Sequence, residues 1–387
     1  MKYNFDEELK LRGTDSIKWD VYDDPQVIAM GCADMDFRTA PKISEGLKAI
    51  AAEGRFSYHF KPDAYFDSII KWYARRFSSM VKKEWICNMP GVFPTIRMCL
   101  QTYAKPGDSV IVQTPHFGPI NTVVKHAGCR LVTNHMIQEN GKYAIDFDDF
   151  ERKIIENKPT VYLMINPHNP TGRVFTVGEL SRLAQICKAH HVLMISDEVH
   201  GNILHGDNKH IPLFEVTKEC VVITAPSKGY NLMDLTYCIL VIPNTAIREK
   251  FLDSMNGFTF GFATNRFGVM ATEIALSEEC DEWLNELTSY LGCNLSYMKM
   301  RLAAMPQITL VDPEAGYLAW IDCRDMNMSP ENLKRFFLTH AKVGLSWGEE
   351  FGDAGCGFER INFACRRETL RVAMDRIEAA LNCVIMK

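Results

Sequence analysis

Long apolar runs and paired cysteines are missing from this sequence of 387 residues. No stretch of about 18 residues is continuously apolar, so we expect no membrane span. The charged N-terminus, MKYNFDEELK, lacks the apolar core of a signal peptide. The thirteen cysteines are scattered and include no Cys-x-x-Cys pair, which argues against a disulfide framework and against a zinc site. We therefore expect mostly buried free thiols in a reducing cytoplasm.

Strong net charge is also missing. The chain has 43 Lys and Arg against 48 Asp and Glu, so its net charge is −5. We therefore expect neither nucleic acid nor an anionic membrane as the main partner. No early strand is followed by Gly-x-Gly-x-x-Gly, which argues against a nicotinamide-dependent dehydrogenase. The length and the 47% of hydrophobic residues allow a large core and two domains.

Strands and helices alternate through the middle of the chain. Five runs rich in apolar and β-branched residues predict strands. These runs are 109–113, 130–134, 160–165, 192–196 and 220–224. The alternation predicts an α/β fold, a three-layer sandwich whose mostly parallel central sheet is covered by helices on both faces. Ligands of such sheets bind beyond the carboxyl ends of the strands.

Side chains at four of these strand ends suit a charged aromatic ligand. They are Phe117 in TPHFGP, Asn169 in NPHNPTG, Asp197 in DEVH, and Ser227 with Lys228 in PSKGYN. Each motif alone is more often a turn or a helix cap. Together they offer an aromatic face, an amide, a carboxylate and an amine. Pyridoxal 5′-phosphate (PLP) needs a ring to stack on, a donor for its hydroxyl oxygen, an anion for its ring nitrogen and an amine for its aldehyde.

Two stretches nearer the N-terminus allow more than one interpretation. Asp34 and Asp36 flank a methionine and could bind a metal, but we favour a role in capping a turn or the next helix, which begins at Pro41. The turn at Gly91 leads into a helix whose first amides are free to bind an anion. An ordinary loop-to-helix entry is the commoner arrangement.

The motifs NPHNPTG, SDEVH and PSK-x-x-N resemble those of the fold-type I PLP-dependent enzymes, the class I/II aminotransferase superfamily, over nearly the whole chain. ADMDF, GVFP, GYLAWID, EEFG and RINFACRR further resemble the branch of cystathionine β-lyase-like C–S lyases. The resemblance implies a segment 1–45 that packs with the small domain, a large PLP-binding domain 46–284 and a smaller α/β domain 285–387.

The resemblance also implies roles for the residues at the strand ends. Lys228 would bind the PLP aldehyde and carry the proton, and Asp197 would pair with the ring nitrogen. Asn169 and His200 would bind the ring hydroxyl oxygen. Phe117 would stack on the ring where this branch usually has tyrosine.

The remaining implied roles concern the phosphate and the substrate. The amides of Gly91, Val92 and Phe93 and the hydroxyl of Ser227 would bind the phosphate. Tyr58 would reach the site of a neighbouring subunit, which implies a homodimer with shared active sites. Arg367, in the RINFACRR motif, would clamp the substrate α-carboxylate.

The implied reaction is β-elimination from L-cystathionine, L-cysteine or S-substituted cysteines. Lys228 would remove the α-proton, and the α-carbanion would lose a thiolate to give aminoacrylate, then pyruvate and ammonia. A PLP-dependent aminotransferase of broad or aromatic specificity is the alternative, because it uses the same residues. A PLP-binding regulator without turnover is a third possibility, which the intact residue set disfavours. Tyr58, Phe117 and the loop 258–265 would set substrate preference.

Overall fold

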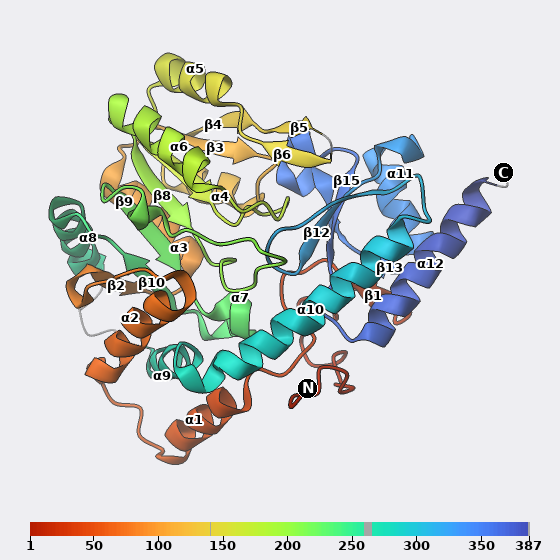
Figure 1. Cartoon of the computed structure of the whole chain (residues 1–387), viewed down its shortest axis with the longest axis horizontal. Helices are drawn as coiled ribbons and strands as arrows, with labels where there is room; N and C mark the ends of the chain where they lie inside the picture. The colour runs from red at the N-terminus through yellow and green to blue at the C-terminus, as the bar shows by residue number, and fades with distance from the viewer. Residues whose placement is uncertain (140, 259–264, 386–387) are drawn as a thin grey trace.

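The computed structural model describes residues 1–139, 141–258 and 265–385, and a seven-stranded sheet lies at the centre of its larger part (Figure 1). The strand order is β2-β10-β9-β8-β7-β3-β4. The strands are β2 (Ile86–Met89), β3 (Ser109–Thr114), β4 (Arg130–His135), β7 (Val161–Ile165), β8 (Leu193–Asp197), β9 (Cys220–Thr224) and β10 (Cys238–Val241). Strands β9, β8, β7, β3 and β4 are parallel, whereas β10 is antiparallel to both of its neighbours. The predicted fold, with its mostly parallel sheet, is confirmed.

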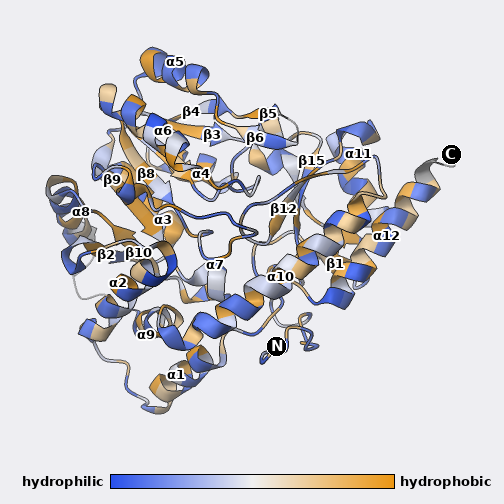
Figure 2. Cartoon of the chain, viewed as in Figure 1, coloured by the Kyte–Doolittle hydropathy of each residue, from blue (hydrophilic) through white to orange (hydrophobic). Residues whose placement is uncertain are grey.

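Helices cover both faces of this sheet because alternate strand residues point to opposite sides. In β3, Val110 and Val112 pack in one buried apolar cluster, whereas Ile111 packs in the other. Figure 2 shows the hydrophobic residues along these strands, with hydrophilic residues on α5 and α6. The helices of this part are α1 (Pro41–Ala52), α2 (Asp63–Phe77), α3 (Val92–Tyr103), α4 (Pro119–His126), α5 (Phe147–Asn157), α6 (Val177–Ala189), α7 (Ser227–Tyr230), α8 (Thr245–Phe258) and α9 (Arg266–Ala275).

A smaller antiparallel sheet is formed by the C-terminal part of the chain. Its order is β11-β12-β15-β14, with β11 (Thr309–Val311), β12 (Leu318–Asp322), β14 (Ser346–Trp347) and β15 (Phe358–Asn362). The helices here are α10 (Asp281–Leu302), α11 (Pro330–Arg335), which continues as a π-helical turn Phe336–His340, and α12 (Arg367–Ile385). In Figure 1, α10 runs from beside α9 to α12.

A strand of the N-terminal segment pairs with a strand of the C-terminal part, apart from the four-stranded sheet. Strand β1 (Ile28–Ala29) pairs in parallel with β13 (Val343–Gly344).

A short hairpin, β5 (Ile137–Glu139) and β6 (Lys142–Ala144), follows β4. In the described part of the chain, no helix is long and apolar enough to cross a membrane.

The structure corrects the capping role expected for Asp34 and Asp36. Helix α1 begins after Ala40 without a side-chain cap. The carboxylate of Asp36 instead lies 3.0 Å from the Nζ of Lys18, a lysine that is only 2% exposed. The carboxylate of Asp34 lies 3.6 Å from the same ammonium. A buried lysine needs a nearby negative charge, and these two aspartates supply it.

Candidate active site

Four neighbouring parallel strands bring the predicted residues to one edge of the large sheet. Phe117 follows β3, Asn169 follows β7, Asp197 ends β8, and Lys228 follows β9. These strands are adjacent in the order β9-β8-β7-β3. Because the carboxyl ends of parallel strands meet at the same edge, the four residues lie at this edge of the sheet.

Asp197 is a buried carboxylate at the end of β8. It is 8% exposed, and its Oδ1 accepts one hydrogen bond, from the Val199 amide at 3.3 Å. Within residues 1–139, 141–258 and 265–385, no side chain forms an ion pair with it. Burial raises the pKa of Asp197 to about 7. A protonated ring nitrogen would supply the missing positive charge, so this position fits PLP.

Lys228 is held against the N-terminal segment. Its Nζ donates to the carbonyl oxygen of Ala33 at 2.8 Å. Burial lowers the pKa of Lys228 to about 8; the neighbouring Cys32 raises it and Arg360 lowers it further. With this pKa about a tenth of the amine is neutral at pH 7 and about half at pH 8, and the neutral amine is the form that attacks an aldehyde or removes a proton.

Arg360 in β15 is a site residue that the sequence analysis missed. It is 2% exposed, and its Nη1 donates to the Oδ1 of Asn169 at 3.0 Å. Its Nη2 donates to the Gly31 carbonyl and the Ser346 hydroxyl, and its guanidinium lies 5.6 Å from the centre of the Phe117 ring. The Nε is buried and has no hydrogen-bond partner among the residues that the structure describes. This buried cation can bind the carboxylate of an amino acid.

The structure does not place Arg367 with these residues, which corrects the expected clamp. Arg367 begins α12, and its Nε donates to the Oδ1 of Asn294 at 2.8 Å. Its main-chain amide donates to the hydroxyl of Tyr290, and its guanidinium lies over the ring of Tyr297. These three residues belong to α10, so Arg367 joins two helices of the smaller part. Its main-chain amide also donates to the Oδ1 of Asp6 at 3.2 Å. Arg360, seven residues earlier, contacts Asn169 instead.

The start of α3 presents main-chain amides beside the aromatic side chains. Gly91 precedes the helix with a φ of 82°, and Val92 and Phe93 lie in its first turn. First-turn amides have no acceptor within the helix. The ring of Phe93 lies 5.9 Å from that of Phe117, so this helix start borders the site. Ser227, partly buried, begins α7 next to Lys228.

His200 and Tyr58 differ sharply in their environments. His200 is 8% exposed, and burial, followed by the nearby Lys228, lowers its pKa to about 3, so the imidazole is neutral. Tyr58 is 91% exposed and lies in a stretch that also exposes Phe56 and Phe60. The loop 258–265, expected to influence substrate preference, falls largely outside the described residues.

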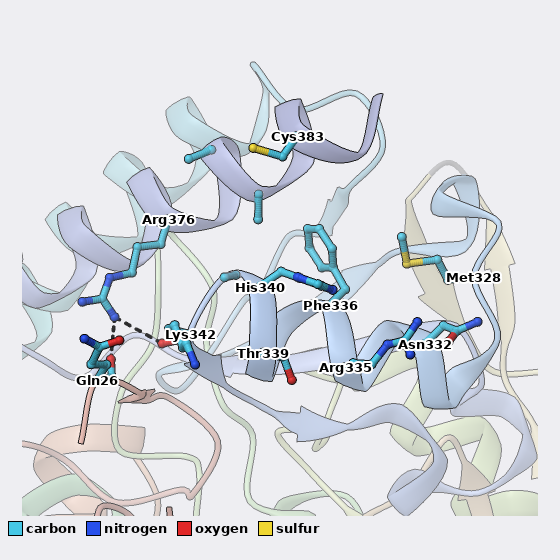
Figure 3. A pocket seen from close by; sticks show the side chains of 13 residues that line it. Gln26, Met328, Asn332, Arg335, Phe336, Thr339, His340, Lys342, Arg376 and Cys383 are labelled. Carbon is cyan, nitrogen blue, oxygen red and sulfur yellow. Dashed lines mark hydrogen bonds between the residues drawn. The ribbon is translucent and has the colours of Figure 1, made fainter. Parts of the chain in front are cut away.

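A separate groove lies on the smaller part of the chain, between the π-helical turn 336–340 and α12 (Figure 3). Its volume is about 840 Å³. Arg376 points toward Gln26 and Lys342 and donates to the carbonyl oxygens of both. None of the predicted site residues lines this groove.

Across the described ranges, no group of three or more His, Cys, Asp or Glu side chains is arranged to hold a metal ion.

Comparisons with known proteins identify the family of the chain. The chain matches the family of class I and II aminotransferases over residues 26–377. Cystathionine beta-lyase PatB of Bacillus subtilis (strain 168) is 34% identical over 98% of this chain and 100% of that protein. Cystalysin from Treponema denticola, which contains a pyridoxal 5′-phosphate cofactor, has a TM-score of 0.94 and 29% identity over 99% of this chain and 100% of that one. A PLP-bound C–S lyase from Staphylococcus hominis has a TM-score of 0.91 and 28% identity over 98% and 99%.

Proposed function

This chain belongs to the class I and II aminotransferase family, and we propose that it is a PLP-dependent C–S β-lyase. The proposed substrates are L-cystathionine, L-cysteine and S-substituted cysteines, which would be cleaved to a thiol, pyruvate and ammonia. The observation that carries this proposal is the full-length identity of 34% with a cystathionine β-lyase. The cluster of Lys228, Asp197, Asn169 and Arg360 supports it, because these residues meet the needs of both cofactor and amino acid.

Bound PLP would supply an aldehyde for the amino group of the substrate and a ring that accepts electrons from its α-carbon. Lys228 would hold the aldehyde at rest and, once released, would remove the α-proton with its neutral amine. Asp197 would keep the ring nitrogen protonated. Arg360 would bind the α-carboxylate, and Asn169 would orient the ring hydroxyl oxygen.

The remaining assignments concern the phosphate and the ring. The amides of Gly91, Val92 and Phe93 would bind the phosphate, with the hydroxyl of Ser227. Phe117 would stack on one face of the ring.

We propose that two copies of the chain share their active sites. The exposed ring of Tyr58 makes no hydrogen bond in the described part of its own chain, and its neighbours Phe56 and Phe60 are 67% and 89% exposed. Exposed aromatic residues of this kind are enriched at protein interfaces. In such a dimer Tyr58 would reach the phosphate of the partner site. The thirteen free cysteines support a cytoplasmic location.

The test uses purified protein with PLP. An absorbance band of lysine-bound PLP should form with the native chain and be absent from Lys228→Ala. Addition of L-cystathionine should then release pyruvate. An aminotransferase would be favoured instead if the amino-acid substrate yields a keto acid only after another keto acid is added to accept its amino group. Failure to form the band would overturn PLP dependence.

A further inference from the structure

The carbonyl oxygen of Ala33 receives two donors at once. The Nζ of Lys228 lies 2.8 Å from it, and the hydroxyl of Tyr317 lies 2.9 Å from it. Tyr317 is fully buried, and burial raises its pKa well above the ordinary value, so the hydroxyl keeps its proton and donates. A carbonyl oxygen has two lone pairs, so these two donors occupy its whole accepting capacity.

The main chain around Ala33 has little freedom to move. Asn362 donates its Nδ2 to the carbonyls on either side, those of Cys32 and Asp34, both at 2.6 Å. Two residues further on, the Nδ2 of Asn231 donates to the carbonyls of Met35 and Phe37. Side chains therefore hold a run of carbonyls along this segment, and the Ala33 oxygen is fixed in place between Lys228 and Tyr317.

We propose that Tyr317 is a positioning residue that acts on Lys228 through the Ala33 carbonyl, keeping the amine oriented and limiting how well its charged form is stabilised. An ammonium gains more than a neutral amine from a strong acceptor, because the hydrogen bond is charge-assisted. The Tyr317 hydroxyl draws electron density from the same oxygen and weakens it as an acceptor for Lys228. The released lysine is thereby kept available as a base. This inference rests on the proposed role of Lys228.

Other groups around the amine act in addition to this carbonyl. They lie on three separate elements, and none of them donates to the Ala33 oxygen. The charged or titratable groups that face Lys228 are Cys32 and Asp34 on the N-terminal segment, Asp197 and His200 at the end of β8, and Arg360 on β15. A variant that changes only the Tyr317 hydroxyl leaves all of them in place.

The experiment measures how fast apoenzyme captures added PLP as a function of pH, followed by the absorbance band of lysine-bound PLP. Capture requires the neutral amine, so its midpoint reports the pKa of Lys228. The native midpoint should lie near 8. In Tyr317→Phe the midpoint should move to higher pH by about half a unit, as expected for a strengthened hydrogen bond to the charged form. Tyr143→Phe is the matched control, because Tyr143 is also buried but its hydroxyl accepts from Trp320.

A second substitution makes the test independent of the folding of Tyr317→Phe. Replacing Tyr317 by 3-fluorotyrosine strengthens its hydroxyl as a donor and should move the midpoint to lower pH. If Tyr317→Phe folds, the inference is overturned when its midpoint equals those of the native protein and Tyr143→Phe. If Tyr317→Phe does not fold, the inference is overturned when the fluorinated protein has the native midpoint. Absence of the band from the native protein would instead defeat the proposed role of Lys228.

Discussion

Arg360 and Asn169 connect the small sheet to the large one at the site. The Nη1 of Arg360, in β15, donates to the Oδ1 of Asn169, in the loop after β7, at 3.0 Å. A guanidinium has donors and no acceptor, so the amide of Asn169 must turn its oxygen toward Arg360. The Nδ2 of Asn169 is thereby left to donate elsewhere. In the proposed function, this one contact would orient the amide for the cofactor hydroxyl and keep the cation in place for the substrate carboxylate.

We predict that Arg360→Lys raises the KM for L-cystathionine by about 10- to 100-fold, the loss expected for a charge-assisted hydrogen bond. Lysine keeps the positive charge but has no planar fork to bind a carboxylate and Asn169 together. Steady-state pyruvate release gives the measurement. Arg367→Lys is the control, and its KM should stay near the native value because Arg367 contacts α10. The reverse outcome, with KM raised only in the Arg367 variant, would restore Arg367 as the clamp.

We predict that Asp197→Asn stabilises the apoenzyme at pH 8 while weakening its affinity for PLP. The pKa of Asp197 is about 7 in the folded chain, above the ordinary 3.8. The folded state therefore binds an extra proton between these values, and its stability falls as the pH rises through about 4 to 7, by up to a few kcal/mol. Asparagine has no such proton to lose. Thermal unfolding of both apoproteins at pH 5 and pH 8 tests this, and an equal pH dependence in the two would contradict it.

The local pattern of apolar and β-branched residues predicts much of the fold, and the positions of the strand ends predict much of the site. The run CVVIT predicts β9 with its observed bounds, and the strand ends predict the positions of Asp197 and Lys228 along the sheet. Strands β2 and β10 were missed, since each has only four residues and β2 follows a charged turn at 82–84. Such short runs carry little periodicity.

Arg360 was missed for a different reason. An arginine within a strand is ordinarily assigned to its solvent-exposed face, and the family resemblance assigns the clamp to Arg367 in the same motif. Arg360 becomes a site residue only when β15 pairs with β12 and β14 and its side chain meets Asn169, which lies 191 positions away in the chain. Local pattern carries no information about a contact of that range.

We predict that Glu198→Gln destabilises the protein by on the order of 2 kcal/mol, the cost of leaving a buried polar group poorly paired. Glu198 is 3% exposed, and its carboxylate accepts from the Nε2 of His210, the hydroxyl of Ser196 and the amide of Leu213. Denaturant unfolding of the two holoenzymes gives the comparison. Glu282→Gln is the matched control, because Glu282 pairs with Lys2 on the surface and should change stability by less than about 0.5 kcal/mol. Equal effects in the two variants would contradict a structural role for the buried carboxylate.

The proposed sharing of active sites between two chains gives a prediction that requires both chains. Lys228→Ala and Tyr58→Ala should each have little activity as homodimers, because each lacks one residue at both sites. In a hybrid dimer, the site that takes Lys228 from one chain and Tyr58 from the other is complete. Unfolding and refolding an equal mixture should therefore restore about a quarter of the native activity, because half of the dimers are hybrids with one working site each.

Differently tagged chains make the hybrid separable, so its specific activity can be measured directly. If the mixture is no more active than its two components, Tyr58 contributes to the active site of its own chain or to neither active site. A mixture of Lys228→Ala with Arg360→Ala provides the control. Lys228 and Arg360 belong to one site of one chain, so no hybrid arrangement completes a site and activity should stay low.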